Sequence, residues 1–211
     1  SILIYLLSLL YSQDHWETAI YAYDDWAYLV PETEPPSDWN TLDFDESAWL
    51  TGPGGFGYGD NDDGTEINAA ISVYFRSIFT VYDASKLSVA IIHADYDDGV
   101  VVYLNGTEIG RSYNLGNPGT FTPYNMTPST DHEAQLYSGG YPEQYFLDSL
   151  QLASLLVEGE NVLSAQVHNM GISSSDMSSN IFLSFGIIDE STYYGATPNW
   201  FQPTLSSNLP I

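Results

Sequence analysis

ADYDDGVVVYLNGTEIGR, residues 94–111, is the stretch of this sequence that decides the fold. An acidic loop opens it, and a run of β-branched and aromatic residues follows, which is typical of a strand. Asn105 and Gly106 then supply the two positive-φ positions of a type I′ turn, the strongest short-range signal of a β-hairpin. Residues 107–111 are long enough for the return strand. Because carboxylate-rich and carbonyl-rich loops gather at one end of these strands, we expect any ligand to bind near that end.

Other stretches of the chain predict further strands of an antiparallel sandwich. Residues 87–94 (LSVAIIHA) are apolar enough for a buried strand, and residues 73–81 (VYFRSIFTV) alternate between two faces. Residues 162–168 predict a strand that is buried on one side only, with Leu163, Ala165 and Val167 facing the core. Residues 181–188 (IFLSFGII) predict the last strong strand. Only short helices are expected, near residues 46–49 and 149–156, so the predicted class is all-β.

The charge of the chain limits its partners. The sequence has three basic residues, Arg76, Lys86 and Arg111, against 28 acidic ones, and its formal net charge is −25. Nucleic acids and anionic membrane surfaces are therefore poor partners, because both require Lys and Arg. Divalent cations are natural counter-ions, although acidic surfaces also keep extracellular or salt-adapted proteins soluble. The absence of Cys excludes disulfides, thiolate zinc sites and cysteine nucleophiles.

The two ends of the sequence differ in character from its middle. Residues 2–10 (ILIYLLSLL) are too few to span a bilayer, which needs about 20 residues, but they suit the apolar core of a signal peptide. We therefore predict a truncated signal peptide over residues 1–13 and a secreted or cell-surface mature protein without a membrane span. The alternative is a buried first strand. Residues 191–211 lack periodicity and are interpreted as a linker and the start of a downstream domain.

Acidic loops supply candidate metal ligands. The segment Asp-Asn-Asp-Asp-Gly at residues 60–64 resembles the start of an oxygen-rich Ca²⁺ loop, but it lacks the spaced Glu of an EF-hand. The best candidates for a Ca²⁺ site are Asp60, Asp62, Asp97 and Asp98. The alternative interpretation is that all four are solvated loop acids.

A second set of polar residues is predicted to contact an organic ligand. Arg76 lies within a predicted strand, where burial alone would be costly, so it either pairs with a carboxylate or meets a ligand. His168 and Asn169 lie at the end of another predicted strand. The candidate ligand-binding residues are Arg76, Asp97, Asp98, Arg111, His168 and Asn169. Paired carboxylates such as Asp97 and Asp98 could serve glycoside hydrolysis, but 28 acidic residues form pairs by chance, so we predict no catalytic residues.

Several motifs that follow one another in order carry a family resemblance. They are DFDESAW (43–49), GP (52–53), FGYGD (56–60), YFR (74–76), DDGVVVYLNG (97–106) and GENVL (159–163). The set resembles the galactose-binding-like β-sandwich modules of secreted bacterial enzymes and surface proteins, over roughly residues 20–190. The resemblance implies a jelly-roll sandwich, an accessory role without catalytic residues or organic cofactor, and sugars or Ca²⁺ as ligands. Residues 206–211 (SSNLPI) resemble the entry to a CotH-type spore-coat kinase domain.

Two functions follow from these observations. The first is a non-catalytic module that binds a glycan or a cell-surface polysaccharide and holds Ca²⁺. The second is a structural spacer that positions a downstream CotH-type kinase or hydrolase domain. A solvent-exposed aromatic platform beside an acidic loop would favour binding over spacing.

Overall fold

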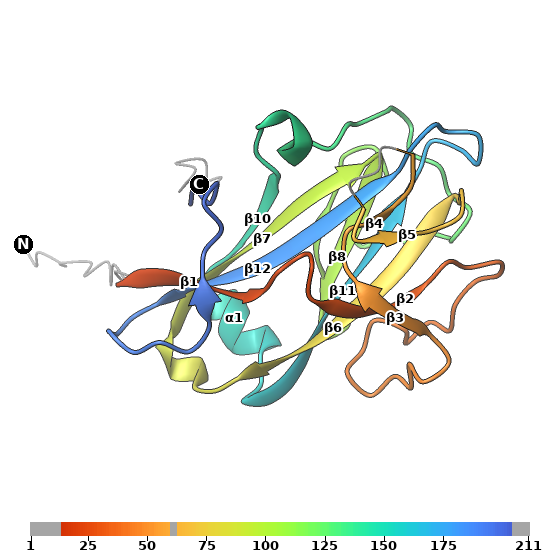
Figure 1. Ribbon diagram of the computed structural model, residues 1–211. Helices are drawn as coiled ribbons and strands as arrows, with labels where there is room; N and C mark the ends of the chain where they lie inside the picture. Colours follow the sequence, from red (N-terminus) through yellow and green to blue (C-terminus); the bar gives the residue numbers. More distant parts are fainter. Residues whose placement is uncertain (1–13, 60–62, 204–211) are drawn as a thin grey trace, which may run out of the picture.

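The computed structural model describes residues 14–59 and 63–203, which form two antiparallel sheets packed face to face (Figure 1). The first sheet has the strand order β10-β7-β12-β1-β13 and the second has the order β3-β2-β6-β11-β8-β9. The first sheet consists of β10 (Glu143–Leu147), β7 (Leu87–Asp97), β12 (Ser178–Ile187), β1 (His15–Ile20) and β13 (Gly195–Ala196). The second consists of β3 (Leu50–Pro53), β2 (Asp25–Leu29), β6 (Ser72–Val81), β11 (Gly159–His168), β8 (Gly99–Leu104) and β9 (Thr107–Arg111).

The path of the chain confirms the predicted jelly-roll sandwich. The chain crosses from β6 in the second sheet to β7 in the first and back to β8, and it crosses again from β10 to β11 to β12. Two very short strands, β4 (Phe56–Gly57) and β5 (Thr65–Glu66), form a separate parallel pair. The predicted class, all-β with little helix, is therefore confirmed.

The central hairpin forms as predicted from Asn105 and Gly106. Asn105 has φ 48° and Gly106 has φ 83°, and the turn brings Leu104 opposite Thr107. Asn105 also makes a side-chain contact, since its amide nitrogen donates to the carbonyl of Leu155 at 2.8 Å. The turn thus closes β8 on β9 and also ties the hairpin to the end of the helix.

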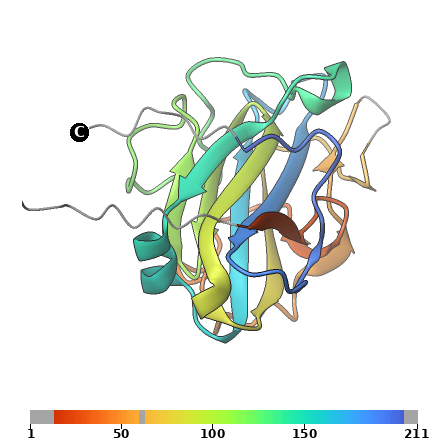
Figure 2. The ribbon, with the colours of Figure 1, turned by 90° about the vertical axis from the view of Figure 1, so that its left-hand side faces the viewer.

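The predicted helix near residues 149–156 is present, and the one near 46–49 is not. The helix α1 (Ser149–Leu155) begins at a capping box in which the Asp148 side chain accepts from the backbone of Gln151, and the Gln151 side chain accepts from the backbone of Asp148. Figure 2 shows α1 at one edge of the sandwich. Residues 46–49 instead form one turn, closed by a 2.8 Å hydrogen bond from the Trp49 amide to the Glu46 carbonyl.

No helix in the described ranges is long and apolar enough to cross a membrane.

The space between the two sheets holds the main core. The inward residues of β6, β7, β8, β11 and β12 form one buried apolar cluster, which includes Phe75, Ile92, Val102, Ala165 and Phe185. These positions alternate along each strand, as the sequence pattern predicts. The strands are therefore held in register by burial of one face of each sheet.

The outer face of the second sheet is also buried, which corrects the prediction of a strand buried on one side. Ser164, Gln166 and His168 face away from the core of the sandwich, yet all three are buried. Two long connections account for this burial, and we call them the first covering loop (residues 30–49) and the second covering loop (residues 112–142). Periodicity along β11 could not reveal a cover contributed by distant parts of the chain.

Residues beyond 190 continue the folded part. β13 pairs with β1, and the rings of Trp200 and Phe201 contact His93 at centroid distances of 5.1 and 5.2 Å. The structure therefore extends the sandwich past the boundary expected at residue 190, because aromatic packing holds this segment without periodicity. The predicted signal peptide at 1–13 and the CotH-like residues 206–211 lie outside the described residues.

Candidate functional site

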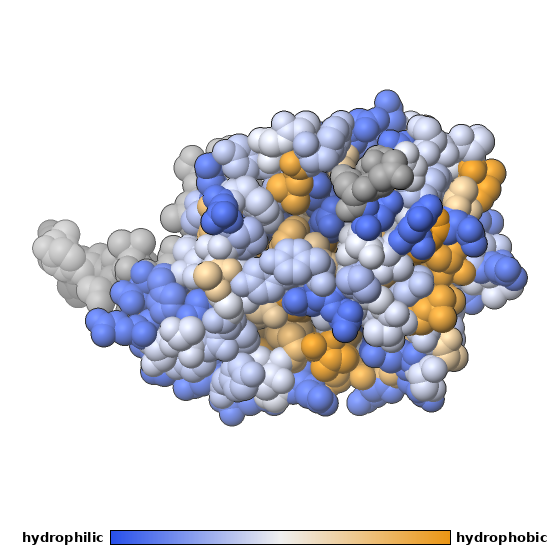
Figure 3. Space-filling model, viewed as in Figure 1, coloured by the Kyte–Doolittle hydropathy of each residue, from blue (hydrophilic) through white to orange (hydrophobic). Residues whose placement is uncertain are grey.

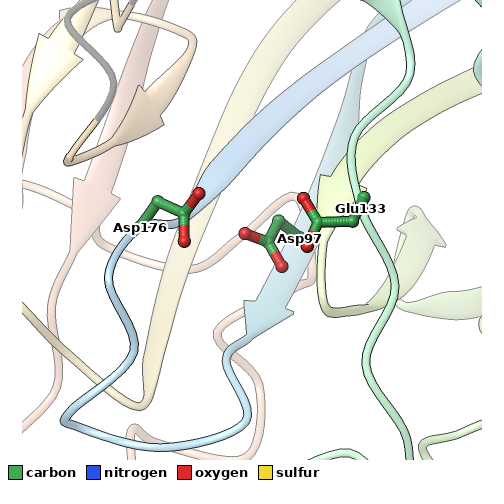
Figure 4. Close-up of side chains that lie close together, drawn as sticks. All are labelled: Asp97, Glu133 and Asp176. Carbon is green, nitrogen blue, oxygen red and sulfur yellow. The ribbon is translucent and has the colours of Figure 1, made fainter.

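Three carboxylates from distant segments meet at one end of the sandwich. Asp97 ends β7, Glu133 belongs to the second covering loop, and Asp176 lies between β11 and β12. One oxygen of each residue lies within 4.8 Å of the others, and Asp97 is buried whereas Glu133 is exposed. Figure 4 shows the carboxylates of Glu133 and Asp176 turned toward Asp97 from opposite sides. We call these three residues the acidic cluster, and it could hold a metal ion.

The electrostatics of the acidic cluster disfavour three negative charges. Burial raises the pKa of the Asp97 carboxyl to about 8, and repulsion from Asp98, Asp176 and Glu133 adds to the increase. Both effects raise the pKa, because loss of water and nearby negative charges each disfavour the ionised carboxylate. A divalent cation would relieve the same repulsion without a proton.

The predicted pair Asp97 and Asp98 is split between two roles. The Asp98 carboxylate accepts from the backbone amide of His132 at 3.0 Å and from that of Met170 at 2.8 Å. Asp98 therefore ties together two of the loops that carry the acidic cluster, while Asp97 belongs to the cluster itself. The other two predicted metal ligands, Asp60 and Asp62, lie outside the described residues.

Arg76 pairs with a carboxylate, which is one of the two alternatives that its sequence position left open. Its Nε donates to Glu46 at 2.6 Å, and its Nη1 donates to the carbonyls of Trp39 and, at 2.8 Å, of Thr41. The guanidinium also lies 5.1 Å from the centre of the Phe44 ring. Arg76 is 1% exposed, so it acts inside the protein as the anchor of the first covering loop.

Arg111 anchors the second covering loop in the same way. Its guanidinium forms a two-point contact with Glu108 at 3.0 and 2.8 Å. It also donates to the carbonyls of Leu115 and Thr120 and to the hydroxyl of Thr122, at 2.8, 2.7 and 2.5 Å. Its side chain is 1% exposed. These bonds fix the path of residues 115–122 across the sheet.

His168 and Asn169 are buried and have protein partners. The His168 ring bonds to the carbonyl of Met126 at 2.8 Å and to the side-chain oxygen of Gln166 at 2.9 Å, and burial lowers its pKa to about 4. Asn169 donates to the hydroxyl of Tyr58 and to the carbonyl of Asp176. His168 thus holds the second covering loop, and Asn169 positions the loop that carries Asp176.

A groove of about 340 Å³ lies where the two covering loops meet over the second sheet. Tyr103 of β8 and Gln166 of β11 come from the sheet beneath it, Trp39 comes from the first covering loop, and Phe121 comes from the second. The other residues that line it are Glu34, Pro35, Ser37, Asn40, Gly106, Glu108, Gly119, Thr120 and Thr122. We call this hollow the groove. Sequence reasoning did not predict it, because it exists only where two loops distant in sequence approach each other.

The second covering loop exposes several large aromatic side chains. Tyr113, Phe121 and Tyr137 are 74%, 73% and 68% exposed. The Tyr113 hydroxyl accepts a hydrogen bond from Thr130, and Tyr137 follows Leu136, whose amide donates to Asp95. On the face shown in Figure 3 the hydrophobic residues form narrow, separate patches. The loop that carries the three exposed rings also carries Glu133 of the acidic cluster.

Comparison with known proteins finds similarity in solved structures alone. No family model matches the chain, and no curated protein matches it. A Bacteroides uniformis beta-glucuronidase is 14% identical, with 81% of this chain covered, 18% of that chain covered and a TM-score of 0.49. The beta-glucuronidase of an uncultured Clostridium is 14% identical, with 83% of this chain and 30% of that chain covered and a TM-score of 0.48. The beta-glucuronidase of Bifidobacterium dentium is 19% identical, with 74% of this chain and 21% of that chain covered and a TM-score of 0.45. This chain spans less than a third of each of these structures.

Proposed function

We propose that this chain is a non-catalytic, carbohydrate-binding accessory module of the galactose-binding-like type, within a larger secreted or cell-surface protein. The observation that carries the proposal is the exposure of three large aromatic side chains on the second covering loop, Tyr113, Phe121 and Tyr137. An aromatic ring is apolar on its face, and the hydroxyl of Tyr adds a polar edge, so such rings stack on sugar rings without the cost of burying polar groups.

The alternative is a structural spacer that positions a downstream CotH-type kinase or hydrolase domain. A spacer needs a stable sandwich, but it has no need to hold large aromatic side chains in water, where exposed apolar surface promotes association. The exposed aromatic side chains of the second covering loop therefore favour binding over spacing.

Affinity electrophoresis of the isolated domain tests the carbohydrate proposal. The gels would contain xylan, galactan, glucomannan or mixed-linkage β-glucan, and dye-labelled bovine serum albumin would report non-specific retardation. We expect retardation of this protein in at least one gel and none of the albumin. If no polysaccharide retards the protein, the spacer function replaces the proposed one.

A specific observation favours a second property, and we propose that the acidic cluster binds Ca²⁺. Ca²⁺ accepts six to eight oxygen ligands in flexible geometry, and three carboxylates from different loops are suited to it. Asp97 provides a buried ligand, Asp176 a half-buried one and Glu133 an exposed one. Such a cation would link the end of β7 to both neighbouring loops.

Scanning calorimetry with millimolar Ca²⁺ against chelator tests the cation site. Binding to the native state alone raises the melting temperature with concentration. Asp97→Asn should abolish the increase. Asp131→Asn, at an exposed acid of the second covering loop, should preserve it. An unchanged melting temperature of the wild type in Ca²⁺ would mean that the site does not exist.

The pH dependence of the same measurement gives a further check. Between about pH 4 and pH 8 native Asp97 holds a proton that the unfolded chain has lost, because its pKa is raised from 3.8 to about 8. Without Ca²⁺, the contribution of Asp97 to stability, taken as the difference between the wild type and Asp97→Asn, should therefore fall as the pH rises through this window. Ca²⁺ requires the ionised carboxylate, so its stabilising effect should be larger at pH 8 than at pH 5.

A further inference from the structure

We infer that the groove between the two covering loops is the carbohydrate site, and that it accepts uncharged oligosaccharides and rejects chains that carry uronate or sulfate. This inference rests on the proposed function and adds to it the place of binding and the class of sugar. The groove has Tyr103 and Gln166 beneath it and the rings of Trp39 and Phe121 on its two sides. Its volume of about 340 Å³ lies at the lower end of the range of small-molecule sites, about 300–1,000 Å³.

Aromatic rings in the groove are fixed by packing on one side and free on the other. Trp39 is buried, and its ring contacts those of Tyr74 and Tyr103 at centroid distances of 4.8 and 5.5 Å. Phe121 is 73% exposed, so its ring is accessible to a ligand without any rearrangement of the core. A sugar ring that enters between them could cover Phe121 and displace water from it.

Buried arginines hold both sides of the groove in place. Arg76 binds the carbonyls of Trp39 and Thr41, and Arg111 binds Thr120 and Thr122. A third link joins the loops directly, since the Tyr124 amide donates to Glu34 at 3.0 Å. The groove is therefore formed before a ligand arrives, which lowers the entropy lost on binding.

The charge of the groove selects against anionic sugars. Glu34 and Glu108 line it, and none of the described lining residues is basic. The three basic residues of the chain all pair with carboxylates: Arg76 with Glu46 at 2.6 Å, Lys86 with Asp189 at 3.3 Å and Arg111 with Glu108 at 2.8 Å. The charge of Glu108 is balanced by Arg111, whereas Glu34 has no ion-pair partner among the described residues. A uronate or sulfate would thus be desolvated beside the Glu34 carboxylate without a free cation, which costs binding energy.

Hydroxyl and amide groups supply the remaining polar surface. Ser37 and Asn40 line the groove and can donate and accept hydrogen bonds, and the Thr120 hydroxyl, which donates to the Asn117 carbonyl, can accept one. Neutral sugars present the same two functions on each hydroxyl group. The combination of exposed ring, neutral polar groups and fixed negative charge therefore matches an uncharged polyhydroxylated ligand.

Matched pairs of polysaccharides and matched variants test the inference. The wild type is compared by affinity electrophoresis on neutral galactan against polygalacturonate and on dextran against dextran sulfate, with xylan, glucomannan and mixed-linkage β-glucan as further neutral probes. We expect retardation by at least one neutral chain and none by polygalacturonate or dextran sulfate. On that neutral chain Phe121→Ala should weaken affinity about tenfold, which corresponds to about 1.4 kcal/mol, in the range expected for loss of one aromatic contact. Tyr82→Ala, at a tyrosine that is 63% exposed and does not line the groove, should leave affinity unchanged.

The outcomes separate this inference from the proposed function. If Tyr113→Ala or Tyr137→Ala abolishes binding and Phe121→Ala preserves it, the groove is not the site, although the module still binds carbohydrate. Binding of the anionic chains in preference to the neutral ones would also overturn the inference alone. If the wild type binds none of the probes, the proposed function fails and the inference fails with it.

Discussion

The outer faces of the two sheets are both covered, but by different kinds of contact. Over the first sheet, the segment that follows β13 lays Trp200 and Phe201 on His93, and Trp200 also contacts Phe182 at 4.9 Å between ring centroids. Over the second sheet, the covering loops are held by hydrogen bonds to Arg76 and other polar side chains. Ring packing is present in both covers, since Trp39 packs on Tyr74 and Tyr103, but only the cover of the second sheet is anchored by a buried arginine.

Each cover buries one histidine, His93 over the first sheet and His168 over the second, and the two rings differ in their hydrogen bonds. Burial lowers the pKa of both His93 and His168 to about 4. His168 has partners on both ring nitrogens, whereas neither nitrogen of His93 has a hydrogen-bond partner in the part of the chain that the structure describes. Buried polar atoms without a partner among the described residues also occur beneath the covering loops, at Tyr74 Oη and Ser164 Oγ, so satisfaction of polar atoms does not distinguish the two covers. The difference is that a bonded network gives the loops one defined path. That path is what shapes the groove.

The largest effect should come from breaking the polar network at Arg76. Arg76→Met removes the guanidinium and leaves Glu46 and the carbonyls of Trp39 and Thr41 without their donor. We expect a loss of about 3–5 kcal/mol in the free energy of unfolding, because two loop carbonyls lose their charged donor at about 1–3 kcal/mol each. Glu46 adds less, because its side chain is 33% exposed and can be hydrated. Urea denaturation measures this loss.

The more exposed ion pair of the first sheet is the control for Arg76. Lys86 and Asp189 are 35% and 29% exposed, so Lys86→Met should leave stability almost unchanged. If Arg76→Met and Lys86→Met lowered the free energy of unfolding equally, the hydrogen bonds of Arg76 would not hold the first covering loop on the second sheet.

A smaller effect should come from removing the apolar cover of the first sheet. Trp200→Ala deletes a half-buried indole that packs on His93 and Phe182. We expect a loss of about 2–3 kcal/mol, below the 3–5 kcal/mol of a fully buried aromatic residue, because part of the ring is already in water. Ile172→Ala, at a side chain that is 59% exposed, is the matched truncation and should cost far less. Equal losses would mean that residues 198–201 do not cover the sheet in solution.

The contrast between the two covers also separates what the sequence could predict from what it could not. Local patterns predicted the hairpin at Asn105 and Gly106, the long strands and the capped helix α1, because each depends on neighbours in the chain. Neither cover was predicted. Residues 191–203 lack periodicity, and the covering loops are rich in turn residues, so nothing local indicates which surface they contact.

In the candidate sites too, the sequence indicated single residues, whereas most of their partners come from distant parts of the chain. Asp97 was predicted as a metal ligand from the acidic run that contains it, but its neighbours in the structure, Glu133 and Asp176, belong to other loops. Arg76 was predicted either to pair with a carboxylate or to meet a ligand, because burying an isolated charge is costly, and Arg111 was predicted as a ligand-binding residue. In the structure both side chains are buried, pair with glutamates and hold the loops that line the groove.

The smallest effect, and the one that compares the two histidines directly, concerns His93→Phe. The unfolded chain takes up a proton on His93 near pH 6.5, but the native state does so only near pH 4. Between these values the unfolded state binds more protons, so the stability contributed by neutral His93 is complete above pH 6.5 and is lost as the pH falls. Phe does not titrate, and its ring can occupy the same place between Trp200 and Phe201 without unsatisfied nitrogens.

His93→Phe should therefore lose less stability than the wild type when the pH falls from 7 to 5. We expect the difference to be about 1–2 kcal/mol, since each unit of pKa shift corresponds to about 1.4 kcal/mol. His168 keeps its lowered pKa and Asp97 its raised pKa in both proteins, so their opposing contributions cancel when the two stability curves are compared. Urea denaturation across this pH range measures both curves. Parallel stability curves for the two proteins would mean that native His93 titrates normally, and so that water reaches it beneath Trp200 and Phe201.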